Sequence, residues 1–467
     1  MDIDLQKCLS INLKPASEKL KAEPSEQVLP VLLNLKEVNF DSLGVIIDSK
    51  IDLVCVIDIS GSMSLDHRID YVQHTIKQLL EYLRDGHRLA IVLFSDKAKT
   101  WLNFKLVNNP ASIAKINEII DSIDPYGGTN ITAGVHEAQR LLGRRKSKNH
   151  ISCIFLLSDG QHNEGPINMD LLYKNDLQRA KCEYTLTSFG YGNSHDARLM
   201  QEMSERKGGN YYFIWDIKKV GGCFVDSLAM VTSIIGQNLR ARLKLRPTPL
   251  FPEIRFLRTF GPYWESESPI EAKVAMSSFY AGFNKNFLCL LGFNAVKEDL
   301  EDDEPLELIV ADLELKIDTL TSPPVTKTFS RAIKLTILPQ NSEEVIIEDE
   351  EVEEQITRVE GAEAIERAEE LTQAKNYDQA IDSLDFFVAK LMKKKFCQKE
   401  LFVRMIDSIE VQKQMIANDR AGTANKYKTI NFSMQTKNIF MNEQAAPQWN
   451  QGLYQNNKMV KMSGIFG

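Results

Sequence analysis

Two short runs of apolar residues are the strongest strand signals in the chain. The first, Leu53 to Ile57, has five apolar residues in a row, and the second occupies most of Ile151 to Leu157. Runs of this length, rich in branched aliphatic residues, are typical of strands buried on both faces of a parallel sheet. An aspartate follows each run, Asp58 after the first and Asp159 after the second. We therefore expect two buried strands that end in carboxylates.

Helical spacing alternates with further apolar runs between these strands and after them. Over Asp66 to Leu83 the apolar residues recur every three or four positions, and Gly86 follows as a stop signal. The same reasoning predicts strands at 89–94, 100–106, 184–189 and 211–214, and helices at 110–120, 135–142, 171–180, 199–206 and 224–235. Strands that alternate with helices predict a doubly wound, mostly parallel α/β sheet over residues 51–237.

The sequence on either side of this unit has a different pattern. Short strand candidates lie at 10–13 and 28–35 before it, and at 239–245, 272–277, 287–293, 306–315 and 332–338 after it. Short strands separated by prolines and other turn signals predict an antiparallel β-sandwich over residues 238–340. The strands within residues 1–50 could be edge strands of the α/β sheet, or they could belong to another domain.

The last part of the chain is charged and helical. Glu343 to Glu354 contains eight acidic residues in twelve, so we interpret residues 341–355 as a solvated linker. Helical spacing over 356–418 predicts a hairpin that turns at Asn376. It resembles one tetratricopeptide helix pair, which is too short for a solenoid, so we expect it to pack on the sandwich or on another copy. Residues 419–467 are polar and basic without periodicity, and we expect them to be irregular.

Composition and charge exclude several classes of function. The net charge of −8 over 467 residues does not favour nucleic acid as the main partner, because phosphate binding needs a concentrated basic face. No apolar run is long enough to span a membrane, and the acidic start of the chain lacks the apolar core of a signal peptide. The seven cysteines include no Cys-x-x-Cys pair, so neither a zinc module nor a disulfide framework is indicated. We expect a cytoplasmic location.

Oxygen-bearing side chains follow the first buried strand. Asp58, Ser60 and Ser62 are spaced two apart, and in an open α/β sheet ligands bind beyond the carboxyl ends of the strands. Carboxylate and hydroxyl oxygens suit a hard cation such as Mg²⁺ or Mn²⁺. The same segment could instead be a helix N-cap on a turn, and alone it does not decide between the two. Thr129, on a Gly-Gly loop before a predicted helix, and Asp159 add two further oxygen donors.

In these residues the chain resembles the von Willebrand factor type A family, whose metal-ion-dependent adhesion site combines Asp-x-Ser-x-Ser with a loop threonine and a strand-end aspartate. The matching positions, in order, are Asp58, Ser60, Ser62, Thr129 and Asp159. The resemblance implies a bound Mg²⁺, with Mn²⁺ as a substitute, and a partner protein that offers an Asp or Glu carboxylate to the metal. Surrounding loops would then set specificity. In this sequence those loops hold Met63, Tyr126, Gln161, His162 and Asn163.

A weaker resemblance covers the flanking sequence. Ser278 to Gly282 is similar to a Leu-Tyr-Ala-Gly segment of inter-α-trypsin-inhibitor-like proteins, in which strands on both sides of the A domain join into one sandwich. This implies that strands from residues 10–50 and 238–340 pair, with the α/β unit inserted between them. Gln444 to Met462 resembles the chain end of intracellular A-domain proteins of plants and ciliates.

Three classes of function are compatible with this sequence. The first is a non-enzymatic protein-interaction module that uses the metal. The second is a structural component of a large assembly, or of a self-association, in which the C-terminal helices and tail make the contacts and the metal is incidental. The third is a Mg²⁺-dependent phosphoryl-transfer enzyme with Asp58 as nucleophile, which is disfavoured because Ser60 stands where haloacid-dehalogenase-like enzymes have a second aspartate. Ser62 is not in a Gly-x-Ser-x-Gly elbow, so a serine hydrolase is not indicated.

Overall fold

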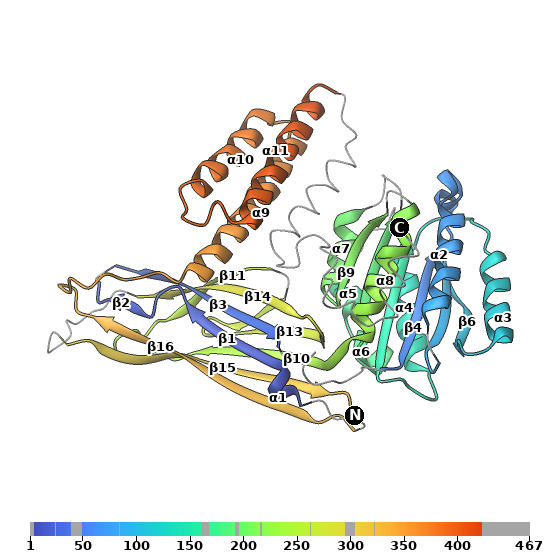
Figure 1. Ribbon diagram of the computed structural model, residues 1–467, viewed down its shortest axis with the longest axis horizontal. Helices are drawn as coiled ribbons and strands as arrows, with labels where there is room; N and C mark the ends of the chain where they lie inside the picture. The colour runs from blue at the N-terminus through green and yellow to red at the C-terminus, as the bar shows by residue number, and fades with distance from the viewer. Residues whose placement is uncertain are drawn as a thin grey trace.

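The computed structural model describes residues 4–23, 25–38, 49–83, 85–159, 168–191, 196–214, 217–261, 263–294, 304–321 and 323–422. Figure 1 shows three parts: a long β-sandwich, an α/β domain beside one end of it, and a group of helices that rises from the sandwich.

The α/β domain is built on a mostly parallel sheet. In the described part of the chain its strand order is β6-β5-β4-β7-β8-β9. The bounds are β4 (Ile51–Asp58), β5 (Arg88–Phe94), β6 (Ala98–Leu106), β7 (Ile151–Ser158), β8 (Thr185–Tyr191) and β9 (Gly208–Ile214). All neighbouring pairs are parallel except β5 with β6, which forms an antiparallel edge. The doubly wound sheet expected from the sequence is confirmed.

Every residue of β4 and β7 is buried, because helices cover both faces of the sheet. Leu53, Cys55 and Ile57 belong to the apolar cluster that includes side chains of α2 (Arg68–Tyr82), α3 (Pro110–Asp121) and α8 (Ile217–Thr232). Val54 and Val56, which alternate with them, belong to a second cluster on the opposite face. The helices of that face are α4 (Ile131–Gly143), α5 (Met169–Tyr173), α6 (Asp176–Ala180) and α7 (Ala197–Glu205). Burial on both faces explains why the sequence of β4 is continuously apolar.

The sandwich consists of two sheets in the described residues. One has the order β1-β3-β14-β11, with bounds β1 (Leu9–Pro15), β3 (Gln27–Glu37), β14 (Asn284–Phe293) and β11 (Arg255–Thr259). The other has the order β12-β13-β10-β15-β16-β2. Its bounds are β12 (Trp264–Ser268), β13 (Glu271–Tyr280), β10 (Ile234–Leu245), β15 (Leu306–Thr319), β16 (Thr326–Leu338) and β2 (Lys19–Lys21). A short helix, α1 (Leu5–Cys8), precedes β1.

The α/β domain is an insertion in this sandwich. Strand β3 precedes the domain and β14 follows it, yet the two pair along their lengths, from Lys36 opposite Asn284 to Gln27 opposite Phe293. This is the pairing implied by the weaker family resemblance. A further contact ties the two parts together, because the Ser277 hydroxyl on β13 donates a hydrogen bond of 2.9 Å to the carbonyl of Lys207, next to β9.

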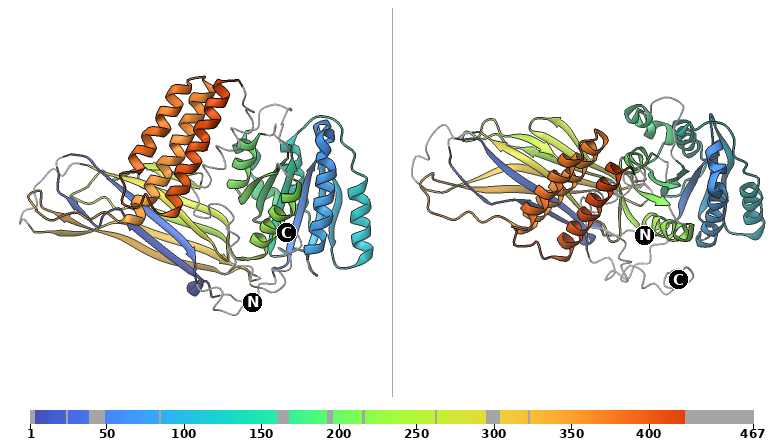
Figure 2. Two further views of the ribbon diagram at one scale, coloured as in Figure 1. Left: turned by 45° about the horizontal axis from the view of Figure 1, so that its top comes forward. Right: turned by 90° about the horizontal axis from the view of Figure 1, so that it is seen from above.

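The C-terminal helices are α9 (Glu350–Gln373), α10 (Tyr377–Leu391) and α11 (Glu400–Arg420). Figure 2 shows them side by side above the sandwich, and α9 contacts β3 and β14. The expected hairpin is therefore extended by a third helix, and α9 begins inside the stretch interpreted as a linker. The acidic residues of its first turn are stabilised by the helix dipole, because they lie at a helix N-terminus. Lysines also pair with them: Lys399 contacts Glu350 at 2.6 Å, and Lys394 contacts Glu353 at 2.8 Å. The tail expected over 419–467 lies outside the described residues beyond Gly422.

Candidate metal centre

The candidate site lies at the point where the strand order of the α/β sheet reverses. The chain starts at the central strand β4, runs outward through β5 to β6, and then returns to β7 on the other side of β4. Strands β4 and β7 are parallel, with Ile57 opposite Leu157, so Asp58 and Asp159 follow them at the same edge. A reversal of this kind opens a crevice beyond the carboxyl ends of the strands, which is the usual ligand site of such sheets.

Hydrogen bonds hold the Asp58 carboxylate and the two serines in one turn. Asp58 is fully buried, and its Oδ1 accepts a hydrogen bond of 2.8 Å from the backbone amide of Ser60. Its Oδ2 accepts a hydrogen bond from the hydroxyl of Ser158, at the end of β7. The hydroxyl oxygens of Ser60 and Ser62 are 3.0 Å apart. The structure therefore brings the first three predicted site residues together.

The loop that carries Thr129 is hydrogen-bonded to this turn. The Tyr126 amide donates to the Ile59 carbonyl at 2.6 Å, and the Gly61 amide donates to the Gly127 carbonyl at 3.0 Å. Thr129, two residues later, is almost completely buried. The backbone contacts thus bring the Thr129 loop beside the Asp-x-Ser-x-Ser turn.

Asp96, which follows β5, holds the same loop from a third strand end. The Gly128 amide donates to Asp96 Oδ1 at 2.8 Å, and Gly127 has a left-handed φ of +79°. A Cβ atom on Gly127 would lie 2.7 Å from Asp96 Oδ2, which is closer than van der Waals contact permits. Glycine is therefore required at 127 both by its backbone conformation and by the approach of Asp96. Neither role for Asp96 could be read from the motif.

Asp159 is paired with Arg68, which is not part of the sequence motif. Its carboxylate is fully buried, and Asp159 Oδ2 accepts a hydrogen bond of 2.7 Å from Nη1 of Arg68, whose side chain is only 9% exposed. Asp159 Oδ1 is buried and has no hydrogen-bond partner among the described residues. One signal was available in the sequence: Arg68 lies one helical turn before Val72, on the apolar stripe of α2.

The electrostatics of the site favour a cation. The pKa of Asp58 is raised from 3.8 to about 7, chiefly by burial and also by the nearby Asp159, while the hydrogen bonds from Ser158 and Ser60 act in the opposite direction. A divalent cation would neutralise these two buried carboxylates. It would also coordinate Asp159 Oδ1, which has no hydrogen-bond partner among the described residues. The neighbouring hydroxyls are hard neutral donors, so the residues present fit Mg²⁺ or Mn²⁺. The described residues include no group of three or more His, Cys, Asp or Glu side chains that could hold a metal, so this candidate site depends on hydroxyl oxygens beside its two carboxylates.

The predicted partner-binding residues have different outcomes. Met63 is fully buried in the apolar core, so its assignment to a partner surface is wrong; it lies in a 3-10 helix, η2 (Gly61–His67), that directs it inward. Tyr126 is 64% exposed beside the loop that carries Thr129 and is available to a partner. Gln161, His162 and Asn163 lie outside the described residues.

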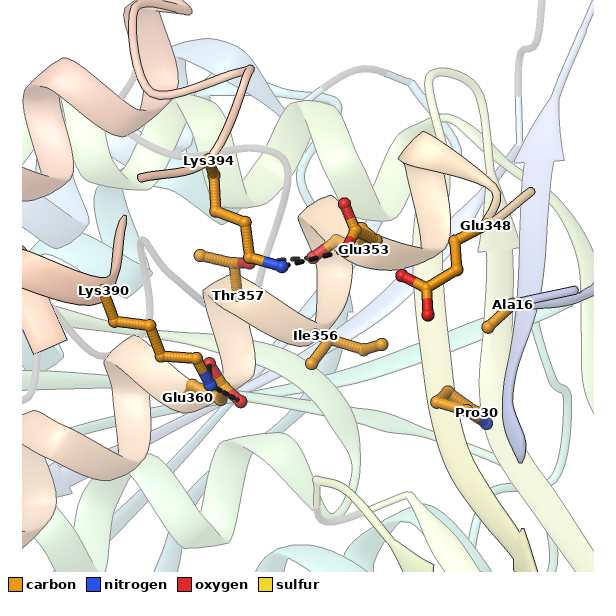
Figure 3. A pocket seen from close by; sticks show the side chains of 9 residues that line it. All are labelled: Ala16, Pro30, Glu348, Glu353, Ile356, Thr357, Glu360, Lys390 and Lys394. Atoms are coloured by element: carbon orange, nitrogen blue, oxygen red, sulfur yellow. Dashed lines mark hydrogen bonds and ion pairs between the residues drawn. The ribbon is translucent and has the colours of Figure 1, made fainter. Parts of the chain in front are cut away.

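A separate cavity of about 80 Å³ lies between the sandwich and helices α9 and α10 (Figure 3). Four of its five charged side chains form ion pairs, with Lys394 2.8 Å from Glu353 and Lys390 2.6 Å from Glu360, and Glu348 is the fifth. Pro30 of β3 lines the opposite wall. The cavity has the character of a packing gap between two layers.

Fold and site together define the class of protein. Residues 52–223 match the family model of the von Willebrand factor type A domain. The chain therefore contains a von Willebrand factor type A (vWA) domain, a family of protein-interaction modules. Within the described residues, no helix is long and apolar enough to cross a membrane.

Curated relatives share the region of this domain. The uncharacterized protein YfbK of Escherichia coli is 28% identical over 200 residues, which are 42% of this chain and 34% of YfbK. Inter-alpha-trypsin inhibitor heavy chain H1 of Bos taurus is 24% identical over 170 residues, 35% of this chain and 19% of the heavy chain. The similarity thus spans about a third or less of each relative.

Two solved structures share the fold over almost the whole chain. A von Willebrand factor type A protein from Catenulispora acidiphila superposes with a TM-score of 0.66 at 13% identity, covering 92% of this chain and 97% of that one. The ArnB paralog VWA2 from Sulfolobus acidocaldarius superposes with a TM-score of 0.57 at 14% identity, covering 93% and 98%. At these identities the likeness establishes the architecture only.

Proposed function

We propose that this protein is a non-enzymatic interaction module that binds an acidic group of a partner protein through Mg²⁺ at the vWA site. The residues that would hold the ion are Asp58, Ser60, Ser62, Thr129 and Asp159. When bound, the ion supplies a Lewis-acidic position that a partner's Asp or Glu carboxylate can occupy. Mn²⁺ could substitute for it.

One observation carries this proposal. Asp58 and Asp159 are both fully buried at the switch point of the sheet, and Asp159 Oδ1 has no hydrogen-bond partner among the described residues. Arg68 balances the charge of Asp159 only, so the charge of Asp58 and one oxygen of Asp159 remain without compensation among the described residues. Such an arrangement is costly and is usually maintained for a bound cation or another function.

Catalysis by Asp58 is less well supported. Both of its carboxylate oxygens accept hydrogen bonds, from Ser60 and Ser158, and the side chain has no exposed surface. A nucleophile must approach its substrate, whereas this carboxylate is held in the interior. Its surroundings favour a role in holding a metal.

The first test uses isothermal titration calorimetry to measure Mg²⁺ binding to the full chain, after the protein has been treated with a chelator. We expect binding to the wild-type protein and loss of binding for Asp58→Asn. Asp70→Asn is the matched control, because Asp70 is an exposed carboxylate on α2 whose contact is His67 at 2.9 Å. Absence of Mg²⁺ binding to the wild type would contradict the proposal.

The second test concerns the partner. Proteins captured by the wild-type chain with Mg²⁺ should be lost with chelator, and also lost with Asp58→Ala or Thr129→Ala. Partners retained in all of these arms would favour the alternative, a structural component whose metal is incidental. Phe386 supports that alternative, because it is 75% exposed on α10 and offers an apolar contact.

A further inference from the structure

The Arg68–Asp159 ion pair places a protein cation inside the candidate metal site. The guanidinium lies 2.7 Å from Asp159 Oδ2, and both side chains are almost fully removed from solvent. An arginine cannot lose its charge under ordinary conditions, so the site contains this positive charge in every state.

The local backbone holds Arg68 in this position. His67 has a left-handed φ of +57°, and it joins η2 to α2. The Arg68 amide donates to the carbonyls of Leu65 and Met63, within the same short segment that begins with the serine hydroxyls. The segment from Ser60 to Arg68 therefore supplies oxygen donors at one end and a cation at the other.

We propose that Arg68 is the built-in counter-cation of this site. Arg68 holds Asp159 when no metal is bound, and its charge makes the metal-loaded site require an anionic partner. The inference rests on the function proposed above. Without metal, Arg68 balances one of the two buried carboxylates, so Arg68, Asp58 and Asp159 together carry one negative charge when Asp58 is ionised. With a divalent ion bound, the ion and these three side chains together carry one positive charge. A partner's carboxylate removes that excess, whereas a neutral group does not.

Arg68 has opposite effects on the stability of the metal-free protein and on the affinity for Mg²⁺. Arg68 stabilises the metal-free protein, because it compensates a buried carboxylate. It weakens the binding of Mg²⁺ alone, because two cations in a poorly solvated site repel each other. A purely structural arginine would act differently: its removal would lower stability and would weaken Mg²⁺ binding or leave it unchanged.

The test compares Arg68→Gln with the wild-type full chain. In chelator, we expect the melting temperature of Arg68→Gln to fall by roughly 5 °C or more, as breaking a buried ion pair predicts. In calorimetry with Mg²⁺ in chloride buffer, we expect Arg68→Gln to bind roughly tenfold more tightly. Acetate, used as the carboxylate probe, should tighten Mg²⁺ binding of the wild type and have a smaller effect on Arg68→Gln.

Matched controls separate charge from packing. Arg68→Lys keeps the charge, so its Mg²⁺ affinity should stay close to that of the wild type. Arg88→Gln removes a partly buried arginine that pairs with Asp52 at 2.6 Å, at the other end of β4, and should lower stability without changing Mg²⁺ affinity. If Arg68→Gln does not fold, the Arg68 Nε resonance of the wild type provides a second measurement; it should shift on Mg²⁺ addition, while that of Arg88 should not.

Each outcome is decisive. Equal or weaker Mg²⁺ binding by Arg68→Gln, with normal binding by the wild type, overturns the role of Arg68 and leaves the proposed function intact. Equal tightening by Arg68→Lys, or an unchanged Arg68 resonance, also overturns it. Absence of Mg²⁺ binding in both wild type and Arg68→Gln overturns both proposals. Binding by Arg68→Gln but not by the wild type supports the counter-cation and contradicts Mg²⁺-dependent function of the natural chain.

Discussion

Asp52 and Asp58 lie near opposite ends of β4, and both are fully buried, but their carboxylates have opposite environments. Asp52 forms ion pairs with Arg88, at 2.6 Å, and with Arg145. The hydrogen bonds to Asp58 that the described residues provide come from Ser60, through its amide and its side chain, and from the Ser158 hydroxyl, none of which carries a charge. One strand thus carries a carboxylate that the protein neutralises directly and another that fits an external cation.

The first prediction concerns the neutralised carboxylate. Asp52→Asn leaves the nearly inaccessible guanidinium of Arg145 without its ion-pair partner. Breaking a buried pair by removing one member costs about 3–5 kcal/mol, and we expect a loss of that size in the free energy of unfolding. Urea denaturation measures it. Mg²⁺ affinity should not change, and a stability loss below about 1 kcal/mol, typical of a surface pair, would contradict the argument.

The second prediction is that Asp58→Asn, unlike Asp52→Asn, preserves the stability of the metal-free protein and impairs Mg²⁺ binding. The substitution removes a buried charge that has no direct ion pair in the described residues, so the metal-free variant should be at least as stable as the metal-free wild type. It should also lose the rise in melting temperature that Mg²⁺ gives the wild type. Thermal unfolding with chelator and with Mg²⁺ measures both effects. A metal-free variant that is clearly less stable would mean that Asp58 has a structural role.

The third prediction is a pH dependence. Because the pKa of Asp58 is raised from 3.8 to about 7 without metal, its contribution to stability is fully present below pH 3.8 and is lost as the pH rises to about 7. Mg²⁺ must displace the proton that Asp58 binds below pH 7. Its affinity should therefore fall by up to about tenfold per pH unit below that value. Calorimetry at pH 6 and pH 7.5 measures the change, and equal affinities at the two pH values would count against it.

The fourth prediction tests the loop that carries Thr129. Gly127→Ala puts a Cβ atom 2.7 Å from Asp96 Oδ2 at a left-handed backbone position, so either the loop or the Asp96 side chain that holds it must shift, and Mg²⁺ affinity should fall. Gly422→Ala is the control, because Gly422 also has a left-handed φ, of +69°, but an added Cβ meets nothing within 4 Å. It should cost only the conformational strain, about 1–2 kcal/mol, and leave Mg²⁺ binding unchanged. Similar metal affinities of the two variants would show that the contact with Asp96 is unimportant.

The sequence was most informative where one physical requirement dominated the pattern. Burial on both faces made β4 and β7 continuously apolar, and the reversal of strand order then brought Asp58 and Asp159 to one edge. The pairing of β3 with β14 followed from a family resemblance and could not be deduced from local pattern, since it joins residues far apart in the chain.

The sequence was least informative where a few backbone angles decide the direction of side chains. The 3-10 helix that begins at Gly61 turns Met63 into the core, which spacing alone could not reveal. A left-handed Asn175 likewise divides the single helix expected over 171–180 into α5 and α6. The acidic stretch has the sequence character of a linker because its partners, such as Lys399, lie in a connection between later helices.

The insertion of one domain into another has a consequence for how the protein is made. Strand β3 can pair with β1 as soon as both have left the ribosome. Its other edge can pair only after β14 has been synthesised, and that pairing includes the hydrogen bonds from Asn34 to Asn284 at 2.8 Å and to Asn286 at 2.7 Å. Until then an incomplete hydrophobic layer is exposed, and such edges invite misassembly during synthesis. Completion of the sandwich thus depends on prompt folding of the inserted sheet, so substitutions that slow it should reduce the yield of native protein even when they spare its final stability.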